Sequence, residues 1–212
     1  RTRSADRPWR WLAAAAVFGC IALNYWWNAH PPGGQSMGVV SAQYPTLLTP
    51  AGWAFSIWGL IFLALAAYSA WQLLPAQRRN PLPDAVALPL SVASAAAGLW
   101  VVCFSYELIT ICTALMLLTL GALVVGYGRA RRLVLGGAAP RPASWPLSLF
   151  LGWISVATTV NVTIALRELG WTTPANVGIL LSVVLLAVLG LGALLALRFR
   201  DAVYPLVLAW GL

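Results

Sequence analysis

Long apolar runs alternate with short polar connectors along this chain of 212 residues. Six runs hold about 20 or more mostly apolar residues, the length that an α-helix needs to cross hydrocarbon about 30 Å thick. They cover residues 9–28, 50–74, 86–106, 108–127, 146–166 and 175–197, and a seventh begins near residue 203. The pattern predicts an all-α integral membrane protein, a polytopic helical bundle.

The overall composition supports this interpretation. Hydrophobic residues make up 61% of the chain and charged residues 8%, whereas soluble domains average about 45–50% and about 25%. A soluble core of this length does not need so many apolar residues. Because the first residue is not methionine and the last lies in an apolar pattern, we expect the natural chain to extend at both ends.

All 13 basic residues are arginine, and their positions predict the orientation. If every run spans the membrane, all but one of the arginines lie on the same side; the exception is Arg167, beside Glu168. Positive charge accumulates on the cytoplasmic side, so we expect a cytoplasmic N-terminus. Arginine in place of lysine, with abundant alanine and leucine, indicates a GC-rich bacterial genome and therefore a bacterial inner membrane.

The net charge of +8 follows from this topology and from contact with anionic lipid headgroups. A nucleic-acid-binding protein would instead gather its basic residues on one element. We therefore expect a lipid bilayer as a partner and no nucleic acid.

Eleven of the 12 tryptophans fall into two groups. One group flanks the spans, where amphipathic indoles settle at the level of the headgroups. The other group lies within or beside the outer halves of the spans. The first comprises Trp9, Trp11, Trp71, Trp145 and Trp171, and the second Trp26, Trp27, Trp53, Trp58, Trp100 and Trp153.

Four polar residues lie in the same outer layer as the second group of tryptophans. They are Asn24, Tyr25, Tyr106 and Asn161. Polar groups at membrane depth are tolerated mainly where they face the bundle interior or a cavity. Flat apolar walls with a few polar groups suit a pocket for a planar hydrophobic ligand. The same indoles would equally serve helix packing and an outer aromatic belt, so both interpretations stay open.

The connector over residues 29–49 is rich in proline, glycine and serine and contains no arginine. Loops of this length in a compact bundle often act as lids. His30 is either incidental or an axial ligand of a metallotetrapyrrole. Glu107 is either a solvated turn residue or a group that relays protons or gates the mouth of the bundle.

No catalytic constellation is visible in the sequence. It contains no Ser/His/Asp set, no paired intramembrane carboxylates, no phosphate-binding glycine loop and no cluster of metal ligands. Cys20, Cys103 and Cys112 lie within spans without metal-ligand or redox spacing, as packing residues would. We therefore expect a protein that is not an enzyme and has no metal site.

Two stretches resemble the translocator protein family, also called TspO or tryptophan-rich sensory proteins. Residues 49–62 (TPAGWAFSIWGLIF) are similar to the family's second helix, with its proline, tryptophan and phenylalanine pattern. Trp153, Ala157 and Asn161 keep the spacing of the fifth helix, which places them on one helix face. Trp100 and Phe104 are similar to an aromatic pair of the third helix.

The chain also departs from the family's pattern. Trp58 follows Trp53 after five residues instead of six, and Leu149-Phe150 replaces a Pro-Tyr pair. Helices beyond the fifth exceed a five-helix bundle, as in a divergent, extended branch. We accordingly divide the single membrane domain into a TspO-like bundle, residues 1–167, and an additional sixth helix and the start of a seventh, residues 168–212.

The resemblance implies a pocket for hydrophobic ligands such as tetrapyrroles or sterols, closed by the loop between the first two helices. Carried over by matching positions, the pocket residues are Trp53, Phe55, Trp58, Trp100, Phe104, Trp153, Ala157, Val160 and Asn161. The implied cofactor or ligand is a haem, porphyrin or chlorophyll-type molecule. In bacteria the family is associated with handling tetrapyrroles in response to light and oxygen.

Two functions from different classes remain open on the sequence. The leading one is a non-enzymatic sensor or carrier that binds a planar, tetrapyrrole-like ligand. The alternative is a structural or accessory subunit of a larger pigment-containing or redox membrane complex, or a homodimer. Stripes of small residues favour close helix contacts and support this alternative. They are Ser91, Ser94, Ala95 and Gly98 in the third span, and Gly192 and Ala196 in the sixth.

Overall fold

The computed structural model describes residues 7–32, 39, 50–171 and 173–211, and every element within them is helical. The α-helices are α1 (Pro8–Ala29), α3 (Ile57–Leu73), α4 (Pro81–Ser105), α5 (Ile109–Leu135), α6 (Trp145–Glu168), α7 (Pro174–Phe199) and α8 (Val203–Gly211). Three short 3₁₀ turns precede or link them, namely η2 (Gly52–Ser56), η3 (Pro75–Gln77) and η4 (Arg141–Ser144).

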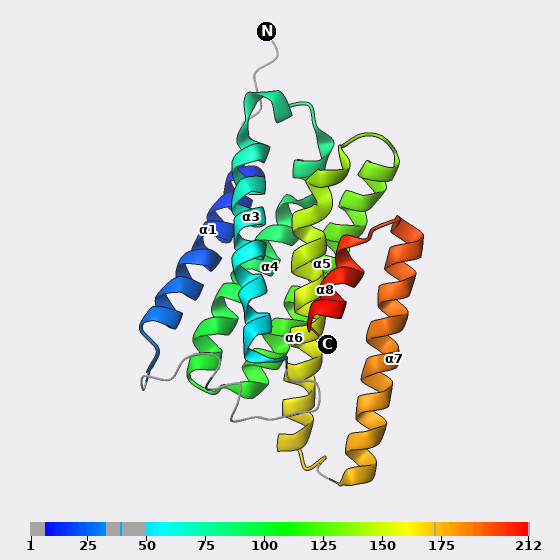
Figure 1. The fold of residues 1–212 in the computed structure, drawn as a ribbon. Helices are drawn as coiled ribbons and strands as arrows, with labels where there is room; N and C mark the ends of the chain where they lie inside the picture. Colours follow the sequence, from blue (N-terminus) through cyan, green and yellow to red (C-terminus); the bar gives the residue numbers. More distant parts are fainter. Residues whose placement is uncertain (1–6, 33–38, 40–49, 172, 212) are drawn as a thin grey trace.

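The long helices run alternately up and down. Figure 1 shows that α1, α4 and α6 begin at the end of the bundle where α3, α5 and α7 finish. Within the described part of the chain, five helical stretches are long and apolar enough to cross a membrane, and they end at Ala29, Leu73, Ser105, Leu135 and Glu168. The prediction of a polytopic all-α membrane protein is confirmed.

The up-and-down order gathers the described arginines at one end, which we call the arginine end. The arginine end comprises the start of α1, the α3–α4 connection, the last turns of α5 with the α5–α6 connection, and the end of α7 with the turn after it. Arg167, in the last turn of α6, is the exception at the opposite end. The asymmetry expected from the sequence is therefore present in the fold.

Two helices extend beyond the predicted boundaries. α4 begins at Pro81, because the side chain of Asn80 accepts a hydrogen bond from the Leu82 N–H at 3.0 Å and proline suits a first helical position. α5 continues to Leu135, so the predicted end at residue 127 is wrong. Its last turns contain Arg131, which is buried and bonded, whereas the sequence prediction treated every arginine here as part of a polar connector.

Close backbone contact joins α1 to α4. A Cβ added at Gly98 would lie 3.1 Å from Leu23 Cδ1 and 3.2 Å from Cys20 Cα, so a larger residue there would push α1 away from α4. Inside a membrane, where lipid is as apolar as leucine, helices associate through such tight packing. The small residues of α4 thus hold α1 against the bundle.

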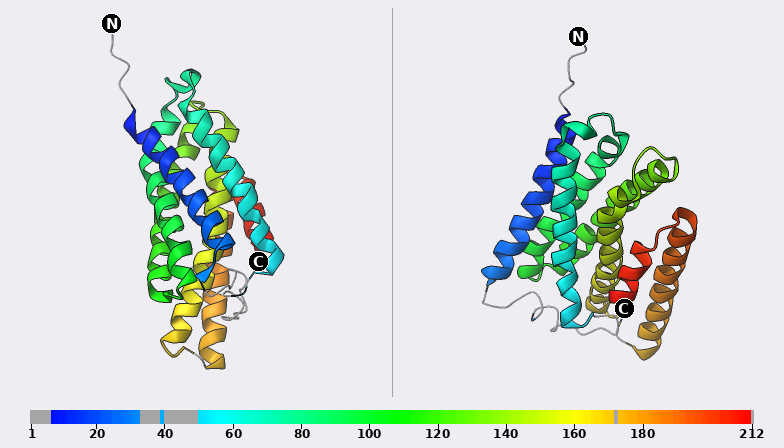
Figure 2. Two further views of the ribbon diagram at one scale, coloured as in Figure 1. Left: turned by 90° about the vertical axis from the view of Figure 1, so that its left-hand side faces the viewer. Right: turned by 45° about the horizontal axis from the view of Figure 1, so that its top comes forward.

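The C-terminal helix α8 turns back into the bundle after α7. Figures 1 and 2 show it beside α6 and between α6 and α7, running away from the arginine end. Glycines permit its close approach: a Cβ at Gly152 of α6 would lie 2.7 Å from Val207 Cβ, and one at Gly192 of α7 would lie 2.8 Å from Leu208 Cδ1. α8 is therefore packed closely against both α6 and α7.

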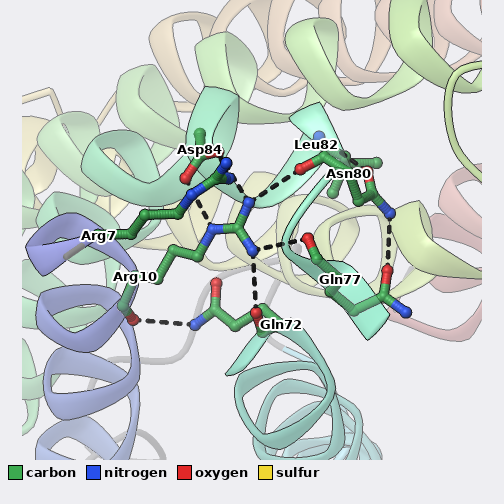
Figure 3. A network of polar contacts seen from close by, with 7 residues as sticks. All are labelled: Arg7, Arg10, Gln72, Gln77, Asn80, Leu82 and Asp84. Atoms are coloured by element: carbon green, nitrogen blue, oxygen red, sulfur yellow. Dashed lines mark hydrogen bonds and ion pairs between the residues drawn. The ribbon is translucent and has the colours of Figure 1, made fainter. Parts of the chain in front are cut away.

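A buried arginine ties three helices together at the arginine end (Figure 3). The guanidinium of Arg10, 4% exposed, donates to both carboxylate oxygens of Asp84 at 2.7 Å. Its remaining N–H groups donate to the backbone carbonyls of Gln72, Gln77 and Asn80 at 2.9–3.1 Å. All five of its donors are thus used. The Gln72 carbonyl lies in the last turn of α3, where backbone carbonyls have no partner within the helix.

A second buried network fixes the reversal between α7 and α8. Asp201, 4% exposed, accepts hydrogen bonds from Tyr127 Oη at 2.9 Å, Ser148 Oγ at 2.6 Å and the Val203 N–H at 2.9 Å. Arg131 donates to the carbonyls of Phe199 and Arg200. Because Arg200 has a left-handed φ of 50°, these bonds hold a turn that a non-glycine residue disfavours.

Candidate functional site

A cavity of about 440 Å³ lies at the end of the bundle opposite to the arginine end. Residues from α1, η2, α3, α4, α5 and α6 line it, near the C-terminal ends of α1, α4 and α6 and the start of α3. Its volume is within the range of small-molecule sites, about 300–1,000 Å³. The up-and-down order therefore creates one hollow between helices that are distant in sequence.

Aromatic residues make up seven of the 18 residues that line the cavity. Trp58 stacks on Phe62 with ring centroids 5.0 Å apart, and Trp100 stacks on Phe104 at 4.7 Å. Trp153, 2% exposed, meets Trp58 edge to face at 6.3 Å. These rings present flat apolar surfaces from three helices, α3, α4 and α6, to one space.

A hydrogen bond between two lining residues fixes the orientation of the α4 wall. The indole N–H of Trp100 donates to Asn161 Oδ1 on α6 at 3.1 Å. The amide of Asn161 donates to the Ala157 carbonyl at 2.9 Å, and Thr113 of α5 donates to the Asn161 carbonyl at 3.3 Å. Asn161 therefore links the pocket faces of α4, α5 and α6.

Amide groups of α1 form the polar part of the lining. The side chain of Asn24, 7% exposed, donates to the Cys20 carbonyl at 3.0 Å, and that of Asn28 donates to the Asn24 carbonyl at 2.8 Å. The two residues are four apart, so they share one face of the helix. Tyr25 also lines the cavity, whereas Tyr106, expected in the same layer, packs edge-on against Trp27 at 5.6 Å instead.

The structure brings together all but one of the pocket residues expected from the sequence. Those lining the cavity are Phe55, Trp58, Trp100, Phe104, Trp153, Ala157, Val160 and Asn161. Trp53 is not among the lining residues: it is 63% exposed and meets Trp210 of α8 edge to face at 4.8 Å.

A change of helix type separates Trp53 from Trp58. Trp53 lies in the 3₁₀ turn η2 and Trp58 in the first turn of α3, so the two side chains do not follow one helical repeat. Trp210 also donates its indole N–H to the Ala54 carbonyl at 3.0 Å. Of these two expected pocket residues, Trp58 therefore lines the cavity and Trp53 belongs to the contact with α8.

Several lining residues were absent from the set expected on the basis of sequence. They are Asn28, Pro50, Gly52, Gly59, Phe62, Val101, Met116 and Ile164, whereas Asn24 and Tyr25, expected in the polar outer layer, also line the cavity. The four-residue spacing of Asn24 and Asn28 was a usable signal. Met116 was not identifiable, because one apolar residue of a uniformly apolar helix gives no indication of which side it faces.

The proposed accessory residues lie outside this cavity. His30 is exposed and stacks on Trp26 with ring centroids 4.4 Å apart. Glu107 occupies the α4–α5 connection with a φ of 56° and is exposed. Most of the expected lid, residues 33–38 and 40–49, lies outside the described residues. Among the residues that the structure describes, no group of three His, Cys, Asp or Glu side chains could hold a metal.

A comparison with protein families adds to this geometry. The model of the TSPO-like protein family matches residues 10–212. The chain belongs to the TSPO-like protein family. It is therefore a multi-pass membrane protein of this family, and the resemblance found in the sequence is confirmed.

The TSPO-like match covers α7 and α8 as well as the helices around the cavity. α8 supplies Trp210 to Trp53, and Gly211 lies against the back of Trp153, where an added Cβ would be 3.4 Å from Cζ3. Comparisons with curated proteins and with solved structures found no match.

Proposed function

We propose that this TSPO-like protein binds a planar hydrophobic ligand of the tetrapyrrole type in the aromatic cavity and acts as a sensor or carrier, without enzymatic activity. The observation that carries the proposal is the convergence of Trp58, Trp100 and Trp153 on one cavity inside the bundle. Large rings gain from stacking on indoles beyond the gain from area burial alone, by about 0.5–1.5 kcal/mol for each pair.

The polar side chains in the cavity lining support the same assignment. Apolar pockets use a few fixed polar groups to orient a ligand. Here Asn161 is positioned by Trp100, and Asn24 and Asn28 are held by α1 backbone carbonyls. A ring system with peripheral oxygen or nitrogen acceptors would satisfy these groups while its faces contact the indoles.

The alternative function, a subunit of a pigment or redox complex, relied on two stripes of small residues. Gly98 of the α4 stripe packs against Cys20 and Leu23 of α1, and Gly192 of the α7 stripe packs against Leu208 of α8. Both glycines make contacts within the chain. The geometry therefore favours ligand binding over docking through these stripes.

Replacing Trp58 by leucine tests the ligand site. We expect roughly 2- to 12-fold weaker porphyrin binding, because one stacking partner is lost. The measurement is saturable quenching of tryptophan fluorescence by a porphyrin in detergent-solubilised protein. Trp53→Leu is the matched control, since Trp53 lies in the same segment but outside the cavity, and it should bind as the unmodified protein does. Equal effects of the two variants would contradict the proposed site.

We also propose that the arginine end is cytoplasmic in a bacterial inner membrane, so that the cavity lies in the outer half of the bilayer. The asymmetry of the arginines supports this orientation by the positive-inside rule. A membrane-impermeant maleimide should label Ser36→Cys on intact cells and spare Ala76→Cys, in a background without Cys20, Cys103 and Cys112. The reverse pattern would invert the orientation and place the cavity on the cytoplasmic side.

A further inference from the structure

The cavity lining is polar in places but carries no formal charge. Within the described residues, the lining consists of apolar and aromatic side chains, three glycine or proline positions, the Tyr25 hydroxyl and the amides of Asn24, Asn28 and Asn161. No arginine, histidine or carboxylate is present among them. An ionised group of a ligand inside the cavity would therefore meet no opposite charge from these walls.

The connectors at the same end of the bundle do not supply a counter-charge either. Residues 29–49 include no arginine, lysine, aspartate or glutamate, and their one histidine, His30, stacks on Trp26 and is not among the lining residues. The other connectors and helix ends there contribute the carboxylates Glu107 and Glu168 against the single guanidinium of Arg167. This end thus carries no excess of positive charge to attract an acidic ligand.

The residues of the arginine end are too distant to compensate. α4 has 25 residues and is therefore about 37 Å long, with Trp100 and Phe104 in its last two turns and the arginine end beyond its first turn. Arg10 and Arg131, the buried arginines, are already bonded at that far end. A carboxylate in the cavity would be an unpaired buried charge, which costs several kcal/mol.

A neutral acceptor avoids this cost. Each side-chain amide has two N–H groups, and Asn161 donates to one carbonyl, that of Ala157. Its second N–H can donate to an ester or ketone oxygen of a ligand. We propose that the cavity selects uncharged planar ligands, such as the esterified form of a tetrapyrrole, over the corresponding carboxylates; this inference rests on the proposed ligand-binding function.

Two porphyrins that share one chromophore test the selectivity. Protoporphyrin IX and its dimethyl ester are titrated into the whole protein in a zwitterionic detergent, with quenching of tryptophan fluorescence as the measurement. Ala157→Phe, which narrows the cavity, should weaken the saturable quenching, and the non-saturable part that remains gives the background from partition into micelles for each compound. We expect the ester to bind tighter by on the order of tenfold or more after subtraction of this background.

A second experiment adds a positive charge to the cavity lining at Asn28, which is exposed. Asn28→Arg should narrow the affinity ratio of ester to acid severalfold, whereas Asn28→Gln, which keeps a neutral amide, should leave the ratio near that of the unmodified protein. Equal or tighter binding of the free acid by the unmodified protein would overturn the selectivity while leaving ligand binding intact. Absence of saturable binding for both compounds would overturn the proposed function itself, and the selectivity with it.

Discussion

Replacing Arg10 by leucine is expected to lower the free energy of unfolding by about 3–5 kcal/mol, because three backbone carbonyls lose a buried donor, at about 1–3 kcal/mol each, while Asp84 stays partly solvated. Its guanidinium is 4% exposed and joins α1 to Asp84 of α4 and to the end of α3. Leucine keeps the volume but leaves the carbonyls of Gln72, Gln77 and Asn80 without their donor. Unfolding by SDS in mixed micelles measures the change.

Arg7→Ala is the matched control for Arg10. Arg7 also pairs with Asp84, but its side chain is 39% exposed, so its loss should cost at most about 1 kcal/mol. Arg10→Lys should fall between the two variants, because one ammonium cannot reproduce the five fixed donors of the guanidinium. If Arg10→Leu and Arg7→Ala destabilise equally, the buried network does not hold the three helices together.

Replacing Asp201 by alanine is expected to cost about 2–4 kcal/mol of stability. The Tyr127 hydroxyl would lose its acceptor inside the bundle, and the Val203 N–H would lose its cap at the start of α8. Because α8 carries Trp210 and lies against Trp153, we also expect fluorescence of the aromatic layer to change. The same SDS titration, followed by tryptophan emission, reports both effects.

Glu168→Ala removes an exposed carboxylate at the other end of α6 and serves as the control, with an expected change within about 0.5 kcal/mol. Asp201→Asn keeps an acceptor for Tyr127 and Ser148 and should be milder than alanine. A stability of Asp201→Ala equal to that of the unmodified protein would show that packing of Val207 and Leu208 alone retains α8.

The nine predicted pocket residues show how much of the cavity lining the sequence predicts. The Trp153, Ala157 and Asn161 spacing placed three side chains on one helix face, and the structure puts all three in the cavity lining. Trp53 belonged to the same kind of motif but points to α8. The direction of an indole near a 3₁₀ turn depends on the exact rotation of the following helix, which a motif match does not specify.

The sequence by itself determined that this protein is a helical membrane bundle. Each apolar run must pair its own backbone N–H and C=O groups inside the bilayer, and its length must match the bilayer thickness. It also determined the separation of charge between the two ends. Both properties follow from the composition of individual segments and do not require knowledge of how the helices pack.

Only the tertiary structure decided which arginines are structural, where α8 packs and which side chains enclose the cavity. Arg10 and Arg131 are identical in sequence terms to their exposed neighbours, yet their carbonyl partners lie 60 or more residues away. In a uniformly apolar helix, lipid-facing and partner-facing residues have the same hydrophobicity. The rotation of each helix is therefore set by close packing at Gly98 and Gly152 and by a few buried hydrogen bonds.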